Sequence, residues 1–221
     1  MENISTYIEQ TNLKPTFTDA DVYQLVEDAA ENKFHGICLP PFWVKKAKRE
    51  ISGRDIKLVT VIGFPLGYNM TETKLEEAIV ALNDGADELD MVMNISAFKS
   101  GMSWVKIEMA KLANLSHQKE ALLKVIIETA YLSDEEIVKA CLLCRDAGVD
   151  FVKTSTGFAS DGAKLEHIKL MRENLPDSVG IKASGGIKDY KFALELIKAG
   201  ANRIGTSSGV AIVKEASLSK V

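Results

Sequence analysis

Cysteines, prolines and long apolar runs are scarce in this chain of 221 residues. The three cysteines (Cys38, Cys141 and Cys144) are too few, and odd in number, for a disulfide framework, which indicates a reducing, cytoplasmic compartment. No run of about 18 apolar residues occurs, so we expect no membrane-spanning helix. The N-terminal segment carries two glutamates and lacks an apolar run, so no signal peptide is expected.

Positive charge is not in excess either, since 27 Lys and Arg stand against 31 Asp and Glu. The net charge of -4 excludes the broad basic surface typical of nucleic-acid-binding proteins, so an anionic ligand must be bound by a local site. Only 5 residues are proline while 46% are hydrophobic, which is typical of a globular protein with a large core. We therefore expect neither a nucleic acid nor a membrane as partner.

Short apolar or β-branched runs recur along the chain and indicate strands of a parallel sheet. Seven runs are visible: Ile37–Leu39, Lys57–Ile62, Leu89–Met93, Leu123–Ile127, Phe151–Thr154, Val179–Ala183 and Arg203–Thr206. An eighth strand is expected within Tyr7–Leu13. Eight such units in 221 residues average about 28 residues each, close to the length of one βαβ step.

The segments between these runs have helical periodicity. Apolar residues in the segment 22–29 follow the i, i+3, i+4, i+7 pattern behind a candidate cap at Thr18, and Ser133 with Glu136 forms a capping box before another helix. Three of the helices are expected to end at glycines in a left-handed conformation, Gly85, Gly148 and Gly200. No linker divides the chain, so the pattern predicts an α/β fold, a single closed (β/α)8 (TIM) barrel domain over residues 1–221.

Three of the predicted strands contain charged residues, although parallel strands covered by helices are normally apolar. Side chains alternate along a strand, so if the apolar neighbours of Asp90, Lys153 and Lys182 face the helices, these three face the barrel axis. They then converge near the C-terminal mouth, where barrels of this fold carry their chemistry. The alternative is a set of ion pairs at a hydrated end of the barrel.

Two lysines against one aspartate leave an excess of positive charge, and that excess has a chemical use. A lysine is a nucleophile only when neutral, which requires its pKa to fall by roughly 3 units, about 4 to 5 kcal/mol. Two ammonium groups about 5 Å apart repel by roughly 3 kcal/mol at an effective dielectric constant of about 20. This predicts a Schiff-base lysine kept neutral by a second lysine, with an aspartate for proton transfer, and leaves open which lysine has which role.

The last two predicted strands end in loops rich in glycine and hydroxyl groups, Ala183–Ile187 and Gly205–Gly209. Glycine lets backbone amides approach an anion, hydroxyls add donors, and a following helix start contributes its dipole. The loops after strands seven and eight are the usual phosphate site of these barrels. A small phosphorylated ligand is therefore expected.

Three segments carry a resemblance to a known family: Lys153–Phe158 (Lys-Thr-Ser-Thr-Gly-Phe), Lys182–Gly186 (Lys-Ala-Ser-Gly-Gly) and Val61–Gly67 (Val-Ile-Gly-Phe-Pro-Leu-Gly). They resemble deoxyribose-phosphate aldolase, in its short bacterial-type subfamily, and the resemblance runs from about Ile8 to Val213. It implies a class I aldolase on a (β/α)8 barrel. Such an enzyme reversibly cleaves 2-deoxy-D-ribose 5-phosphate to D-glyceraldehyde 3-phosphate and acetaldehyde in deoxyribonucleoside catabolism, with no cofactor or metal.

The resemblance also implies residue roles. Lys153 would form the Schiff base, Lys182 would perturb it and assist proton transfer, and Asp90 would donate and accept protons. Glu9 stands where the family usually has an aspartate in the proton relay, and its side chain is one methylene longer. The expected substrate and phosphate contacts are Thr11, Thr156, Gly185, Gly186, Gly205, Ser207 and Ser208.

Several features keep alternatives open. Phe158 stands where longer members of the family carry a lysine, Lys188 could add charge near a phosphate, and Glu128 could be a second acid/base group or a structural partner of a lysine. The three histidines share no spacing, and Cys141 and Cys144 lie on an apolar helix stripe, so we expect no metal site. The competing functions are a Schiff-base aldolase for another phosphosugar and a non-catalytic phosphosugar-binding barrel. A homo-oligomer is compatible with either.

Overall fold

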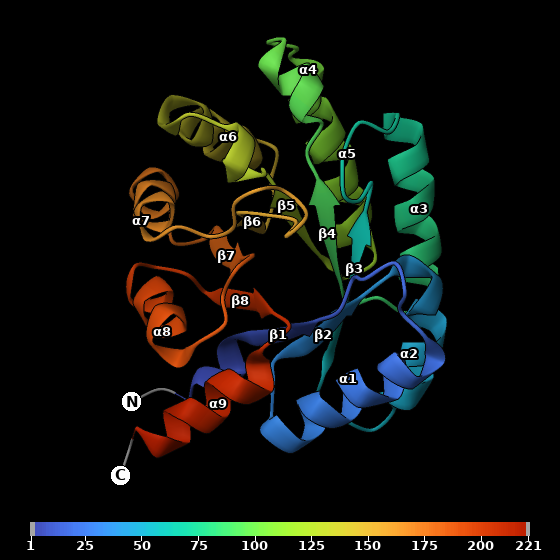
Figure 1. Cartoon of the computed structure of the whole chain (residues 1–221). Helices are drawn as coiled ribbons and strands as arrows, with labels where there is room; N and C mark the ends of the chain where they lie inside the picture. Colours follow the sequence, from blue (N-terminus) through green and yellow to red (C-terminus); the bar gives the residue numbers. More distant parts are fainter. Residues whose placement is uncertain (1–2, 220–221) are drawn as a thin grey trace.

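The computed structural model describes residues 3–219, and its strands close into an eight-stranded parallel barrel (Figure 1). The strands, in their order around the barrel, are β1 (Ile8–Thr11), β2 (Gly36–Leu39), β3 (Lys57–Ile62), β4 (Glu88–Val92), β5 (Leu122–Ile126), β6 (Phe151–Lys153), β7 (Gly180–Ser184) and β8 (Arg203–Thr206). Pairing of β8 with β1 closes the sheet. The predicted fold is thus confirmed; of the predicted domain range, residues 1, 2, 220 and 221 lie outside the described part.

Helices surround the barrel on its outer face (Figure 1). They are α1 (Asp19–Asn32), α2 (Val44–Glu50), α3 (Thr71–Asn83), α4 (Ile95–Lys99), α5 (Trp104–Gln118), α6 (Asp134–Asp146), α7 (Leu165–Asn174), α8 (Tyr190–Lys198) and α9 (Gly209–Leu218), with short 3-10 helices η1 (Ile4–Tyr7), η2 (Pro41–Trp43) and η3 (Thr129–Tyr131). α9 packs beside α1, so the ring of helices closes as the sheet does. Within residues 3–219 no helix is long and apolar enough to cross a membrane.

The predicted helix boundaries have local causes. The Oγ atom of Ser133 accepts a hydrogen bond from the Glu136 amide at 3.3 Å, and the Glu136 carboxylate accepts one from the Ser133 amide at 2.9 Å, so α6 begins at its capping box. Thr18 is the N-cap of α1, as predicted. Positive φ angles also confirm the expected left-handed helix ends at Gly85, Gly148 and Gly200.

The main hydrophobic core lies between the outer face of the barrel and the helices. Strand residues such as Ile37, Leu89 and Ile181 are fully buried there, together with helix residues such as Val22 and Ile168. Because successive strand side chains alternate between faces, the residues between these apolar positions point into the barrel. The outer face therefore supplies the packing and leaves the inner face available for polar side chains.

The inside of the barrel has an apolar part and a charged part. Cys38, Val59 and Val61, from β2 and β3, form a separate buried cluster against Leu13 and Phe64. The inner faces of β1 and β4 to β8 carry the acidic and basic side chains described below. Buried charges are tolerated only where they are paired, so their arrangement determines what the interior can do.

Candidate active site

Asp90 lies at the centre of the three charged residues expected inside the barrel. Its Oδ2 atom accepts hydrogen bonds from Nζ of Lys153 and from Nζ of Lys182, each at 2.7 Å. All three side chains are almost completely buried, which confirms the inward orientation predicted from strand alternation. The two lysine nitrogens share one acceptor oxygen, so they lie no farther apart than twice that bond length.

The charged cluster is larger than predicted, because a third lysine and two further carboxylates belong to it. Lys124, the register partner of Asp90 on β5, is fully buried, and its Nζ atom lies 3.0 Å from Oδ1 of Asp90. The same ammonium lies 3.6 Å from Oε1 of Glu9 and contacts the Glu88 carboxylate. Three lysines therefore face three carboxylates: Lys124, Lys153 and Lys182 against Glu9, Glu88 and Asp90. On β8, Nε of Arg203 lies 4.0 Å from Oε1 of Glu9, so the positive charges still outnumber the carboxylates by one.

The alternation argument could have found Lys124. It lies inside the apolar run Leu123–Ile127, in the same pattern that singled out Lys153 and Lys182. Glu88 likewise shares a strand face with Asp90, two residues away. Neither residue is among those singled out from the sequence.

Glu9 joins the cluster from β1. Its carboxylate is fully buried and accepts a hydrogen bond from Nζ of Lys182 through Oε2, while Oε1 is the oxygen that faces Lys124. The longer side chain at this position thus contacts two lysines at once. The structure places Glu9 beside Lys182, although its part in a proton relay stays a prediction.

The charged neighbours determine the protonation of this cluster. Burial by itself would raise the pKa of Asp90, but Lys124, Lys153 and Lys182 hold the pKa of that carboxyl well below its ordinary value. Burial by itself would lower the pKa of Lys182, yet Asp90 and Glu9 raise it above its ordinary value. At neutral pH, Asp90 is therefore a carboxylate and Lys182 an ammonium.

The charged cluster extends toward the N-terminal end of the barrel through Glu88. His35 Nε2 lies 3.3 Å from Oε1 of Glu88, and carboxylate and ring atoms of Glu9, His35 and Glu88 lie within 4.8 Å of one another. Sequence spacing did not reveal this grouping of metal-ligand types. The two carboxylates, however, already share the Lys124 ammonium, which neutralises the charge that would attract a cation.

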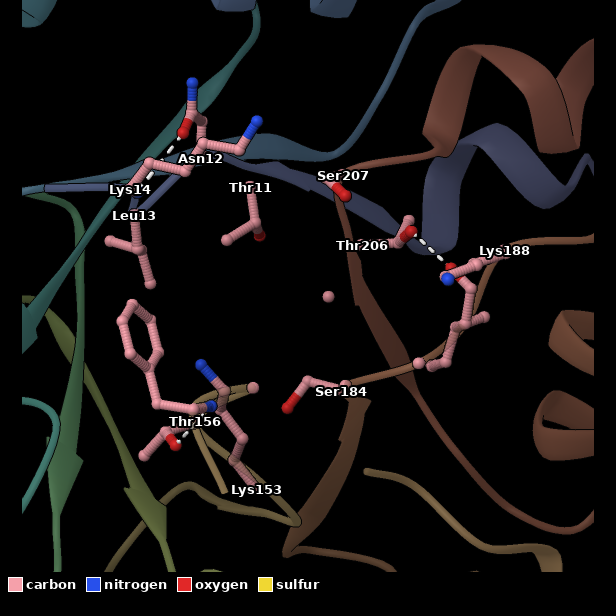
Figure 2. A pocket seen from close by; sticks show the side chains of 16 residues that line it. Thr11, Asn12, Leu13, Lys14, Lys153, Thr156, Ser184, Lys188, Thr206 and Ser207 are labelled. Atoms are coloured by element: carbon pink, nitrogen blue, oxygen red, sulfur yellow. Dashed lines mark hydrogen bonds between the residues drawn. The ribbon is translucent and has the colours of Figure 1, made fainter. Parts of the chain in front are cut away.

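A cavity of about 300 Å³ opens above the cluster at the C-terminal end of the strands. Figure 2 shows Lys153 and Thr156 on one side of it, across from Thr206, Ser207 and Lys188. Of the predicted contacts, Thr11, Thr156, Gly185, Gly186, Gly205 and Ser207 line this cavity. Ser208 is not among the lining residues, and its amide donates to Oγ1 of Thr206 at 2.9 Å. The cavity thus joins Lys153 to both predicted phosphate loops.

The glycines of the loop after β7 are required by geometry. Gly185 has a φ of 86°, and a Cβ there would lie 2.9 Å from Cα of Gly162, while Gly186 has a φ of 76°. Both angles lie in the left-handed region that other residues adopt only with strain. On β8, a Cβ at Gly205 would meet the Lys182 side chain at 3.0 Å, so this glycine also makes room for that lysine.

The wall of the cavity at Phe158 is apolar. Phe158 packs edge-on against Phe64, with ring centroids 5.3 Å apart. This is the position where a lysine would add positive charge in longer relatives of the family that the sequence resembles. Outside the buried cluster, the positive charge at this cavity comes instead from Lys14 and Lys188, which line it.

The residues assigned to packing behave as expected. Cys141 and Cys144 are buried on α6, and burial raises the pKa of the Cys141 thiol to about 12. Cys38 faces the barrel interior, where burial raises its pKa to about 11. Thiols in such environments are poor nucleophiles and poor metal ligands. Away from the cavity, His117 lies 2.9 Å from an oxygen of Asp150, as a partner of that carboxylate.

A buried lysine hydrogen-bonded to a carboxylate, at the base of a cavity at the C-terminal mouth of a (β/α)8 barrel, is the arrangement expected of a Schiff-base enzyme such as an aldolase. Comparison with known proteins agrees. Residues 6–215 match the DeoC/LacD family of aldolases, and the chain belongs to this family.

Individual relatives are similar over nearly their whole length. The deoxyribose-phosphate aldolase of Thermococcus kodakarensis is 52% identical over 216 residues, covering 96% of each chain. The structure of the aldolase QR15 superposes with a TM-score of 0.94 at 42% identity, covering 100% of this chain and 98% of that one. The tetrameric deoxyribose phosphate aldolase of Aeropyrum pernix superposes with a TM-score of 0.90 at 34% identity, covering 99% and 92%.

Proposed function

We propose that this chain is a class I deoxyribose-phosphate aldolase that forms a Schiff base through Lys153. The observation that carries the proposal is the position of the Lys153 amine. It is held at 2.7 Å from Asp90 and lies on the wall of the cavity that both phosphate loops also line. Relatives at about half identity bear the name of this activity. The substrate is 2-deoxy-D-ribose 5-phosphate.

The first half of the reaction uses Lys153 as nucleophile. Its neutral amine adds to the C1 aldehyde, and loss of water from the adduct gives an iminium ion. A base then takes the proton of the C3 hydroxyl, the electrons of the C2–C3 bond move toward the iminium nitrogen, and glyceraldehyde 3-phosphate leaves. The enamine that remains on Lys153 holds the two carbons that become acetaldehyde.

The second half protonates the enamine and releases acetaldehyde. A proton added to C2 restores an iminium ion, and addition of water frees the amine. Asp90, a carboxylate within hydrogen-bond distance of both lysines, is suited to accept protons. Lys182 carries protons next to Lys153 that it can donate, and its carboxylate partners, which raise its pKa, keep it a positive charge there. Glu9, which is bonded to Lys182, completes the proposed relay.

The phosphate is proposed to bind across the cavity from Lys153. Gly185, Gly186 and Gly205 allow a close approach to the backbone, and α9 begins at Gly209, directly after the second loop, so its N-terminal dipole favours an anion there. Ser207 adds a hydroxyl and Lys188 a positive charge. In this proposal, the aldehyde end of the five-carbon sugar phosphate lies at Lys153 and the phosphate end at the opposite wall of the cavity.

Trapping with borohydride tests the proposal. The protein is incubated with deoxyribose 5-phosphate and sodium borohydride, and peptide mass mapping locates the reduced adduct. We expect the added mass on Lys153 and its complete loss in Lys153→Leu. That variant should release no acetaldehyde and should melt at a lower temperature, because Asp90 stays buried and loses one of its lysine partners.

The controls separate the alternatives. Lys182→Leu keeps the nucleophile, so a slow adduct on Lys153 is expected, and an adduct on Lys182 in the native protein would overturn the assignment of the two lysines. Binding of the sugar phosphate without an adduct or acetaldehyde would indicate a non-catalytic barrel. An adduct with other phosphorylated aldehydes and none with this one would indicate a different substrate.

The cellular setting is proposed with the activity. Three free, buried cysteines are consistent with a reducing cytoplasm. The reaction degrades a deoxyribose phosphate, which fits deoxyribonucleoside catabolism. A homo-oligomer formed by this single-domain chain is supported by the tetrameric relative from Aeropyrum pernix, and sedimentation or light scattering would measure it.

A further inference from the structure

Glu128 combines three features that packing alone does not explain. It follows β5 and has a φ of 50°, although it is not a glycine. Among the described residues, Lys33 and Glu120 share this left-handed conformation, but both are exposed at helix ends, whereas Glu128 is only 2% exposed. Strained backbone at a buried position is characteristic of functional sites, because the surroundings must impose it.

Among residues 3–219, the carboxylate of Glu128 has one hydrogen-bond partner, Thr156. Both of its oxygens accept from the amide of Thr156, at 3.3 and 3.2 Å, and Oε2 also accepts from the Thr156 hydroxyl. Backbone hydrogen bonds hold the segment of Glu128 against the segment of Thr156, because the amides of Ile127 and Thr129 donate to the carbonyls of Lys153 and Thr154. Glu128 is therefore held directly over the loop that follows the proposed nucleophile.

The same loop is tied on its other side to β7. Oγ1 of Thr154 donates to the carbonyl of Ser184 at 3.1 Å, and Oγ of Ser184 donates to the carbonyl of Ser155 at 2.6 Å. These bonds already fix the backbone of residues 154 and 155. What Glu128 adds is a constraint on one side chain, that of Thr156.

The hydrogen-bond capacity of Thr156 shows the consequence of that constraint. A hydroxyl has one proton and two lone pairs. The proton goes to Glu128, and one lone pair accepts from the Phe158 amide at 3.0 Å. Thr156 lines the cavity on the Lys153 side (Figure 2). Its remaining capacity is one lone pair, so a ligand group that bonds there must donate a proton.

We propose that Glu128 is a positioning residue that fixes the Thr156 hydroxyl as an acceptor for a hydroxyl of the substrate. The inference rests on the proposed aldolase function. The substrate hydroxyl is the one beside the carbonyl of the acceptor aldehyde, because Thr156 lies three residues after Lys153, at the wall opposite the phosphate loops. Burial opposes the charge that this role requires, raising the pKa of Glu128, while the Thr156 hydrogen bonds and Lys153 act against that rise.

The test is the choice between two acceptors in the synthetic direction. Acetaldehyde is condensed with glyceraldehyde 3-phosphate or with its analogue in which fluorine replaces the hydroxyl at C2. Fluorine has nearly the same size but cannot donate a hydrogen bond. We expect the native enzyme to favour the hydroxyl acceptor about tenfold or more in kcat/KM, because a site built around a hydrogen bond rejects the analogue that lacks it.

Glu128→Gln replaces the accepting carboxylate oxygen at Thr156 with an amide group that donates, and the side chain keeps nearly the same shape. The Gln amide donates to the Thr156 oxygen, so the Thr156 proton is free to point into the cavity, and the preference for the hydroxyl acceptor should fall to about twofold or less. Thr156→Ser should keep the preference and Thr156→Val should lose it. Adding Glu128→Gln to Thr156→Val should change it no further, because Glu128 acts through Thr156.

Other outcomes would overturn the inference. If Glu128→Gln lowers kcat equally for both acceptors, the residue only supports the loop. If the native enzyme turns over both acceptors equally, Thr156 does not read the hydroxyl. Failure of the proposed function looks different, because then the native protein would give neither condensation product nor a borohydride adduct on Lys153.

Discussion

Replacing Lys124 with methionine tests whether the interior of the barrel depends on charge balance. At an effective dielectric constant of about 20, an ammonium 3.0 Å from Asp90 and 3.6 Å from Glu9 is attracted by about 5 kcal/mol to each. Desolvation offsets most of this in the native protein. In Lys124→Met the carboxylates stay buried and lose that partner, so we expect a loss of about 3 to 5 kcal/mol of unfolding free energy at pH 7.

The pH dependence of this loss has a definite sign. Lys124 is among the causes that hold the pKa of Asp90 and of Glu88 below their ordinary values of 3.8 and 4.5. Carboxyl groups with lowered pKa stabilise the fold above those ordinary values, and the contribution disappears as the pH falls through the folded-state pKa. The difference between native protein and variant should therefore be largest at neutral pH and shrink below about pH 4.

Urea denaturation followed by circular dichroism between pH 3 and 8, on the native protein and Lys124→Met, measures both quantities. Lys57→Met, which removes an exposed lysine at the start of β3, is the matched control and should change stability by less than about 0.5 kcal/mol. A loss below about 1 kcal/mol at pH 7, or a loss that does not vary with pH, would refute the charge-balance reasoning.

Two further predictions concern the reaction. Glu9→Gln removes one of the two carboxylates that raise the pKa of Lys182, so the alkaline limb of the kcat/KM profile for deoxyribose 5-phosphate should move to lower pH. An unmoved limb would exclude Lys182 as the ammonium whose deprotonation produces that limb. Lys188→Met should raise the KM for deoxyribose 5-phosphate about three- to tenfold and leave that for unphosphorylated deoxyribose unchanged, since Lys188 lines the cavity on the side proposed to bind phosphate. Equal effects on both sugars would contradict a contact between Lys188 and the phosphate.

Most of the fold was predictable because its determinants are local. Apolar runs, the capping box at Ser133 and the glycines that end three of the helices each act within a few residues, and together they define repeated βα units. Predicted strand ends agree with the observed ones or differ by one or two residues. The segment Tyr7–Leu13, for example, contains a strand only at Ile8–Thr11, because Tyr7 closes the short helix η1.

The site was predictable only in part, because its contacts join distant strands. Inward orientation of Asp90, Lys153 and Lys182 followed from alternation within single strands. The membership of the charged cluster did not, since it depends on Glu9 and Lys124 meeting across the barrel. The partner of Glu128 was also hidden, because Thr156 lies 28 positions away and is reached only through pairing of β5 with β6.

The division of the barrel interior has a consequence for redesign. Val59 and Val61 line the apolar part and have no ionisable group, whereas the charged groups share one continuous set of ion pairs on other strands. The two parts nevertheless meet, because Val59 and Val61 on β3 are the strand partners of Glu88 and Asp90 on β4. Substitutions at contacting sites do not combine additively, so a redesign that changes the side-chain volume of the apolar part also changes the surroundings of these two carboxylates.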